Sequence, residues 1–167
     1  MKDNKLRALG WWQPFGSLML HPYNKIETRV PSIDVKTGKE RKLPFPLGKY
    51  LIYTTQKSTP EHLLKQWCGE EIYNDIINKL ANEETAGLNG YAIAIGELAQ
   101  IRDMRPEDER QCFIKYKPDK DCLVFKNVQR ILPFRWRHGK QGVGFVPEEE
   151  MYKIKMLPDD AFTRAVV

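Results

Sequence analysis

Glu27 and Arg29 are the two side chains of this sequence that are best placed to do chemistry together. They lie two residues apart in "KIETRV", residues 25–30, and a β-strand of that composition directs both to the same face. A carboxylate beside a guanidinium can act as a base or orient a hydroxyl nucleophile while the arginine holds a phosphate. The alternative is a surface ion pair worth about 0 to 1 kcal/mol. With the adjacent Lys25, these residues form the predicted catalytic group.

A basic segment near the end of the chain is the most nucleic-acid-like stretch. No acidic residue lies between Asp121 and Glu148, and aromatic residues interrupt the positive charges. Such a run can bind phosphates and stack bases, although a solvated turn with inward-facing aromatics has the same composition. Gln13 and Ser17, which begin an early helix, add groups that can contact a base edge or a phosphate. The residues of the run predicted to bind nucleic acid are Lys126, Arg130, Arg135, Arg137, His138 and Lys140.

Trp11, Trp12 and Tyr53 are a candidate aromatic pocket for an unstacked base, since single-stranded RNA is commonly recognised by stacking. Residues of these types also form ordinary core. The three histidines are scattered, and the three cysteines lack the paired spacing of a zinc site. We therefore predict no metal, no disulfide framework and no cofactor, because nucleotide-cofactor signatures are absent as well.

The length of 167 residues predicts a single domain over residues 1–167. A composition of 41% hydrophobic and 29% charged residues is typical of a soluble globular protein. The N-terminal residues lack the apolar segment of a secretory signal, so the cytoplasm is the expected location. A net charge of +5 mildly favours polyanionic partners.

Hydrophobic patterning predicts a mixed α+β protein with a small β-barrel. A short helix is expected to begin at Pro14 and to end before Pro22, and a helical insertion over about 59–88 contains two amphipathic helices broken at Gly69. Residues 34–48 and 105–121 have the composition of an exposed loop and a charged connection. The expected strands cover residues 6–13, 25–30, 49–55, 90–101, 122–134 and 151–157.

Six short motifs occur in an order that resembles the ASCH domain family of PUA-like proteins. They are "QPFGSLML", "KIETR", "GKYLIYTT", "GYAIAIGEL", "NVQRILPF" and "GKQGVGFV", and the resemblance spans roughly Leu6 to Met156. The family hallmark G-x-K-x-x-E-x-R corresponds here to Pro22, Asn24, Glu27 and Arg29. The acid and the arginine are kept, whereas the glycine and the lysine are not. Lys25 stands one position after the hallmark lysine, which on a strand directs it to the opposite face unless a bulge re-aims it.

The resemblance implies a PUA-like fold with a cleft between the barrel and the early helix, and contact with RNA or a modified nucleoside. Some members resemble ribonucleases in activity, while one branch hydrolyses acetylated cytidine with a lysine, a threonine and a glutamate. Asn24 replaces that lysine and Glu27 that threonine. We therefore expect a protein that binds RNA or a nucleotide, and ribonuclease activity is one reaction that it could catalyse. Two alternatives stay open, an amidohydrolase acting on a modified nucleoside and a protein-interaction module with a basic face.

Overall fold

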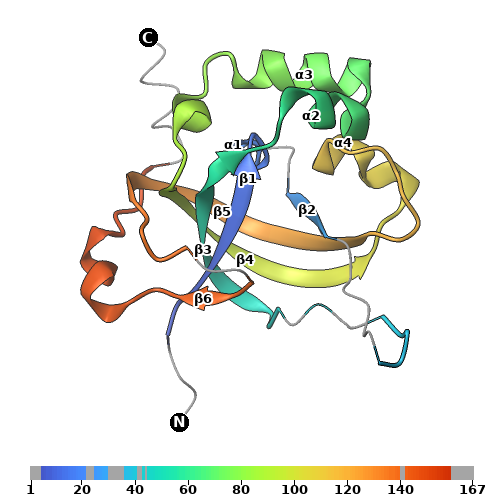
Figure 1. Cartoon of the computed structure of the whole chain (residues 1–167). Helices are drawn as coiled ribbons and strands as arrows, with labels where there is room; N and C mark the ends of the chain where they lie inside the picture. Colours follow the sequence, from blue (N-terminus) through green and yellow to red (C-terminus); the bar gives the residue numbers. More distant parts are fainter. Residues whose placement is uncertain are drawn as a thin grey trace.

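The computed structural model describes residues 5–21, 25–29, 36–40, 43, 45–139 and 142–158. Within them, six strands form one sheet, and the α-helices gather at one side of it (Figure 1). The strands are β1 (Arg7–Gln13), β2 (Ile26–Arg29), β3 (Gly48–Ser58), β4 (Tyr91–Asp103), β5 (Asp121–Arg135) and β6 (Gly144–Phe145). The α-helices are α1 (Phe15–Leu18), α2 (Glu61–Cys68), α3 (Glu70–Leu80) and α4 (Glu109–Cys112). Three 3-10 helices are η1 (Glu84–Gly87), η2 (Pro106–Asp108) and η3 (Glu148–Lys153). The predicted α+β class is confirmed.

The sheet has the strand order β2-β5-β4-β3-β1-β6, with β1 and β3 parallel and the other pairs antiparallel. Three register shifts interrupt the pairing of β4 with β5, and such bulges increase strand bending and twist. The edge strand β2 thereby approaches β1, where Arg29 Nη2 donates to the carbonyl of Gly10 at 2.9 Å. A side chain, not a backbone ladder, joins these strands in the described part of the chain. The sheet is therefore open, and closure into a small barrel stays a prediction.

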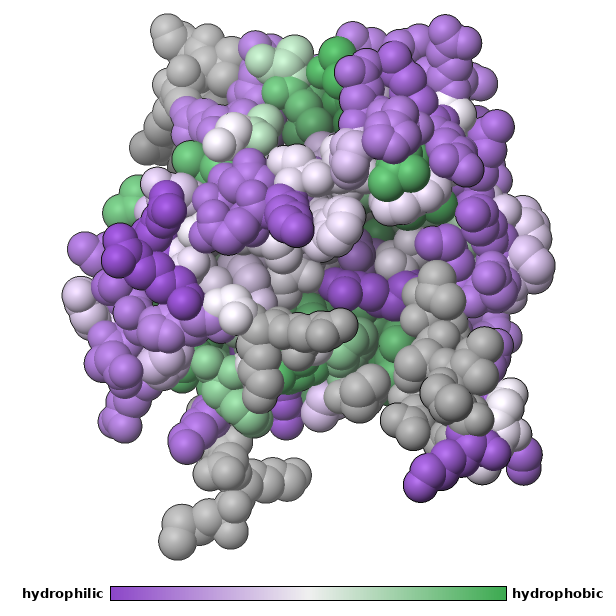
Figure 2. Space-filling model, in the orientation of Figure 1, coloured by the Kyte–Doolittle hydropathy of each residue, from purple (hydrophilic) through white to green (hydrophobic). Residues whose placement is uncertain are grey.

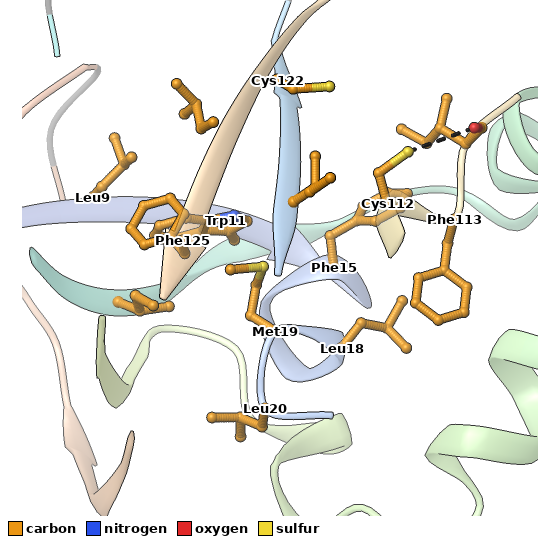
Figure 3. Close-up of a cluster of buried hydrophobic side chains, with 14 of the residues drawn as sticks. Leu9, Trp11, Phe15, Leu18, Met19, Leu20, Cys112, Phe113, Cys122 and Phe125 are labelled. Carbon is orange, nitrogen blue, oxygen red and sulfur yellow. Dashed lines mark hydrogen bonds between the residues drawn. The ribbon is translucent and has the colours of Figure 1, made fainter. Parts of the chain in front are cut away.

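The main core lies between the sheet and the helices. Trp11 and Phe125 pack edge to face with ring centroids 5.4 Å apart, and Met19 and Phe15 of the α1 region belong to the same cluster, with Phe15 beside Cys112 (Figure 3). A smaller cluster includes Tyr53, Ala8, Ile131 and Trp136. Side chains thus cover both faces of the central strands, which explains the unbroken buried run of β3 from Tyr50 to Thr54.

The predicted helical pair broken at Gly69 is confirmed as α2 and α3. Gly69 has φ of 77°, a left-handed conformation that favours glycine, and it both ends α2 and precedes α3. The helices pack through Leu64, Cys68 and Ile76, all of them buried. A backbone hydrogen bond of 3.0 Å from Lys115 to the carbonyl of Trp67 attaches α2 to the loop before β5.

The predicted strand over residues 151–157 is wrong. Residues 148–153 form η3, which begins after Pro147 with three glutamates, a favourable start for a helical turn. Met156 makes only an isolated bridge to Ile131. The charged connection over 105–121 also contains η2 and α4, which Asp108 organises by accepting from Arg105 N at 2.8 Å and from both terminal nitrogens of Arg102.

The face of the molecule in Figure 2 is mostly hydrophilic, with hydrophobic residues in small separate patches. Exposed apolar side chains in such small patches are normal on soluble proteins. No helix in the described segments has the length and apolar character that crossing a bilayer requires.

Candidate functional site

Glu27 and Arg29 leave the same face of β2, as the sequence predicts. β2 pairs with β5 and alternates buried Ile26 and Thr28 with partly exposed Glu27 and Arg29. Arg29 Nε lies 3.2 Å from Glu27 Oε1, and its Nη2 is held by the Gly10 carbonyl of β1. The arginine is therefore fixed across the gap between β2 and β1, and it holds the carboxylate beside that gap.

A cavity of about 290 Å³ opens at this gap, and we call it the Glu27 pocket. Its aromatic residues come from different elements: Trp12 from β1, Phe15 from α1 and Trp67 from α2. Trp12 is 46% exposed, so its indole ring is accessible to a ligand. The other lining residues are Glu27, Thr28, Arg29, Thr59, Ile114 and Lys120.

Buried polar atoms without a hydrogen-bond partner gather around the Glu27 pocket. Thr28 Oγ1, Thr59 Oγ1 and Arg29 Nε belong to lining residues, and none of them makes a hydrogen bond with the described residues. Arg29 Nε is near Glu27 but is not aligned for such a bond. The buried Trp11 indole N–H is also without a well-aligned partner, although it interacts with Glu27. The hydroxyls of Thr28 and Thr59 are therefore the groups that lack a partner among the described residues, and each unsatisfied buried group of this kind lowers stability by about 1 to 3 kcal/mol.

Burial raises the pKa of Glu27 to about 7, against an ordinary value of 4.5. The positive charges of Arg29 and Lys120 and the Trp11 indole each lower it in part. The Glu27 side chain keeps 15% of its area exposed, so solvent or a ligand can reach it. A carboxylic acid with a pKa near 7 can both take and give a proton at neutral pH.

Lys120 is a pocket residue that sequence reasoning missed. It directly precedes β5, where Asp121 pairs with Arg29, and its carbonyl accepts from Met104 N at 2.9 Å. Burial is the main cause that lowers the pKa of its ammonium group, with repulsion from Lys117 second. Only the register of β2 against β5 brings Lys120 to Glu27, and no local sequence signal reveals that register.

Thr59 and Trp67 were also missed, because they belong to the helical insertion. Thr59 N donates to the carbonyl of Gln13 at 2.7 Å, which places its side chain at the pocket. In the sequence, the spacing of Trp67 indicates only the apolar face of a helix.

Lys25 is not brought to the Glu27 pocket. Its ammonium group donates to the carbonyls of Met19 and His21 at 3.4 and 3.3 Å, and it lines a separate cavity of about 890 Å³ beside α3 and α4. Burial and, to a smaller extent, Arg130 lower its pKa. Asn24, at the position of the hallmark lysine, lies outside the described residues.

Gln13 and Ser17 are buried and bonded to each other rather than open to a ligand. Gln13 Nε2 donates to Ser17 Oγ at 2.8 Å and to the carbonyl of Thr85 at 2.9 Å. Ser17 Oγ and Thr85 Oγ1 lie 2.8 Å apart. This network joins β1, α1 and η1.

The basic run is free of acids in sequence but not in space. Arg130 is held by both oxygens of Glu83 at 2.8 and 2.6 Å, Lys126 lies 3.4 Å from Glu97, and His138 lies 3.2 Å from Glu150. Arg135 stacks over the ring of Tyr91 at 5.6 Å. Arg137 is exposed and lines a cavity of about 490 Å³, and Lys140 lies outside the described residues.

Of the three residues of the predicted aromatic pocket, Trp12 and Tyr53 line one cavity and Trp11 does not. Trp11 is fully buried in the main core, whereas Tyr53 packs on Trp136 with ring centroids 5.3 Å apart. Trp12 lines both the Glu27 pocket and the cavity that contains Tyr53, Trp136 and Arg137. Across the described segments, no group of three or more His, Cys, Asp or Glu side chains is arranged to hold a metal ion.

No protein-family model and no curated protein matches this sequence. Among solved structures, the ASCH protein of Zymomonas mobilis matches with a TM-score of 0.50 and 14% identity, over 90% of this chain and 94% of that one. Two single-substitution variants of it match with TM-scores of 0.49 at 13% and 15% identity, over 89% and 92% of this chain and 95% and 96% of theirs. At these identities the likeness concerns the fold. The chain therefore has the fold of an ASCH domain protein.

Proposed function

We propose that this protein binds RNA or a nucleotide, with one nucleoside unit in the Glu27 pocket. The observation that carries the proposal is an aromatic-lined cavity whose lining residues Thr28 and Thr59 have buried hydroxyls without a partner among the described residues. A nucleobase offers flat faces to Trp12 and Trp67 and hydrogen-bonding edges to Thr28 and Thr59. When these side chains turn toward the ligand, binding would thus satisfy groups that have no partner among the described residues.

The size and charge of the pocket support a single nucleotide unit. Small-molecule sites usually span about 300 to 1,000 Å³, and the Glu27 pocket, at about 290 Å³, is at the small end. Arg29 and Lys120 supply positive charge that attracts a phosphate, and the guanidinium can contact two of its oxygens.

The arrangement suits cleavage of an RNA phosphodiester. Ionised Glu27 takes the proton of a ribose 2′-hydroxyl, whose oxygen then attacks the neighbouring phosphorus. Arg29 and Lys120 stabilise the negative charge that develops on the phosphoryl oxygens. The bond from phosphorus to the 5′-oxygen breaks, the leaving oxygen takes a proton from the Lys120 ammonium group or from water, and the product is a 2′,3′-cyclic phosphate.

Lys120 also favours a second candidate, hydrolysis of an acylated nucleoside. The hallmark lysine is absent at Asn24, which argues against this reaction in the sequence. However, Lys120, Thr59 and Glu27 line one pocket. A lysine, a threonine and a carboxylate are therefore available to activate water and to stabilise the oxyanion formed at an amide carbonyl.

The test uses the purified chain with two substrates and one binding assay. Release of cyclic phosphate from an end-labelled single-stranded RNA and release of acetate from acetylated cytidine distinguish the two reactions. Calorimetric titration with the four ribonucleoside 5′-monophosphates measures binding.

Glu27→Gln is the test variant. Its control is the same substitution outside the pocket, Glu107→Gln, at an exposed residue of η2. We expect Glu27→Gln to weaken nucleotide binding or turnover by about tenfold or more, as losing a charged hydrogen bond does. If no nucleotide binds, or if the two variants behave alike, the Glu27 pocket is not the site.

A further inference from the structure

We infer that a second cavity beside the Glu27 pocket holds the adjacent nucleotide, so that the preferred ligand is a single-stranded RNA segment rather than a free nucleoside. This inference rests on the proposed function and specifies its ligand. The cavity measures about 490 Å³, and we call it the Trp136 pocket.

The Trp136 pocket has an aromatic wall that is rigidly held. Tyr53 and Trp136 are 4% and 3% exposed, and their rings pack 5.3 Å apart at an interplanar angle of 30°. Trp136 N donates to the carbonyl of Gly90 at 2.8 Å, which fixes the chain after β5 against the start of β4. These two rings are too buried to stack a base themselves, but they form a fixed floor of the cavity, and the exposed indole of Trp12 supplies the face on which a base can stack.

Trp136 also has an unused hydrogen-bond donor. Its indole Nε1 is buried and has no partner among the described residues, whereas Thr54 Oγ1, another group of the same pocket, donates to the Leu88 carbonyl at 2.7 Å. Both cavities thus have a lining residue with a buried polar atom that has no partner among the described residues.

Arg137 provides the charge at this second cavity. Its side chain is exposed, lines the cavity and makes no ion pair with any residue that the structure describes. In the same run, Arg130, Lys126 and His138 face carboxylates. Arg137 is therefore better placed than these neighbours to hold a phosphate.

Trp12 connects the two cavities. It lines both of them. Opposite Trp12, the pairing of β1 with β3 shifts register, because β3 has extra residues between Thr54 and Ser58. An exposed indole between two pockets can contact two successive bases, and a continuous RNA strand would then pass over it.

The experiment compares mononucleotides with dinucleotides, both 2′-O-methylated so that attack by the 2′-hydroxyl cannot cleave them. We expect the best dinucleotide to bind about tenfold or more tightly than the best mononucleotide, since stacking of one base contributes about 1 to 3 kcal/mol. Arg137→Ala should reduce this gain, because it removes the contact with the linking phosphate, and leave mononucleotide affinity unchanged. Arg135→Ala is the matched control, because Arg135 stacks on Tyr91 and does not line the cavity.

The outcomes separate this inference from the proposed function. Mononucleotide binding without any gain for dinucleotides overturns the second subsite and leaves the Glu27 pocket in place. An equal loss in Arg135→Ala and Arg137→Ala shows diffuse charge attraction and also overturns the subsite. Absence of all nucleotide binding, together with tight binding of an acidic peptide, overturns both in favour of a protein partner.

Discussion

The protonation state of Glu27 decides which chemistry the residues of the Glu27 pocket can perform. Burial favours the neutral acid, whereas Arg29 and Lys120 favour the carboxylate. The resulting pKa of about 7 lets both forms exist at neutral pH. A carboxylate needed only for stability would be better solvated or more fully paired, because an unsatisfied buried charge lowers stability.

Glu27→Gln should therefore stabilise the protein at alkaline pH. Between pH 4.5 and 7 only the unfolded chain loses the Glu27 proton, so the free energy of unfolding falls as the pH rises. Over this interval the loss amounts to about 3 kcal/mol, at about 1.4 kcal/mol per pH unit. Denaturant titrations at pH 5 and pH 8 should show the advantage of the variant growing with pH. An unchanged difference between variant and wild type would mean that Glu27 titrates normally.

Lys120→Met should raise the pKa of Glu27 further, because the Lys120 charge lowers it. The change can be followed through the Glu27 carboxyl carbon in a pH titration by NMR. Lys117→Met removes a neighbouring exposed lysine that does not line the pocket, and it should leave the pKa of Glu27 unchanged. If both variants change the pKa of Glu27 equally, the charge of Lys120 does not act on Glu27 more strongly than that of Lys117.

At the scale of elements, the gap between β2 and β1 creates the site. β2 is only four residues long and pairs on one side with β5. On its other side, Arg29 reaches Gly10 instead of a backbone ladder forming. Residues from the helical insertion and from the loop before β5 fill the remaining space, which leaves the Glu27 pocket.

The Gln13–Ser17–Thr85 network should hold β1, α1 and η1 in place without contacting the ligand. Ser17→Ala removes two hydrogen bonds, although Gln13 Nε2 keeps the carbonyls of Thr85 and Leu88 and the Thr85 hydroxyl keeps Glu83. At about 0.5 to 1.5 kcal/mol for each lost bond, we expect the free energy of unfolding to fall by about 1 to 3 kcal/mol. Ser58→Ala is the control: Ser58 is exposed and accepts from Asn89, and exposed changes usually stay within about 0.5 kcal/mol. Nucleotide affinity should change little in either variant. A large loss of affinity with unchanged stability in Ser17→Ala would instead make Ser17 a ligand contact.

Over the whole molecule, the distribution of charge matters more than the net charge of +5. Acidic residues distant in sequence neutralise much of the basic run, since Glu83 and Glu150 lie against Arg130 and His138. Among the described cations of the run, Arg135 and Arg137 have no acidic partner; Arg137 lines the Trp136 pocket, whereas Arg135 lies outside it and is expected to contact only an RNA strand that extends beyond the two pockets.

Replacing Arg135 and Arg137 together by alanine should flatten the salt dependence of binding to a ten-nucleotide RNA. Each lost phosphate contact reduces the slope of log affinity against log salt concentration by about 0.7 for a single strand. Lys126→Ala should have a smaller effect, because Lys126 lies beside Glu97. Equal slopes for all three proteins would show that this surface does not contact the RNA backbone.

The sequence predicts what depends on local periodicity. The two-residue period of a strand places Glu27 and Arg29 on one face, and helical spacing reveals α2 and α3 on either side of Gly69. Lys120 and Trp67 reach the pocket through strand register and helix docking, which depend on long-range contacts that local patterns do not encode. For the same reason the acid-free run around Arg130 does not reveal its contact with Glu83, and the alternation in residues 151–157 does not reveal a 3-10 helix.

The central claim is that a nucleoside unit occupies the Glu27 pocket, and the four tryptophans report on it directly. Trp12 and Trp67 line that pocket, whereas Trp136 lines only the neighbouring one of the two. The measurement is the indole N–H region of a nitrogen–proton correlation spectrum during titration with ribonucleoside 5′-monophosphates, with signals assigned by Trp12→Phe and Trp67→Phe. We predict that the Trp12 and Trp67 signals move together and saturate while the Trp136 signal stays in place. Saturating shifts confined to Trp136, or no shift of any indole signal, would contradict the account.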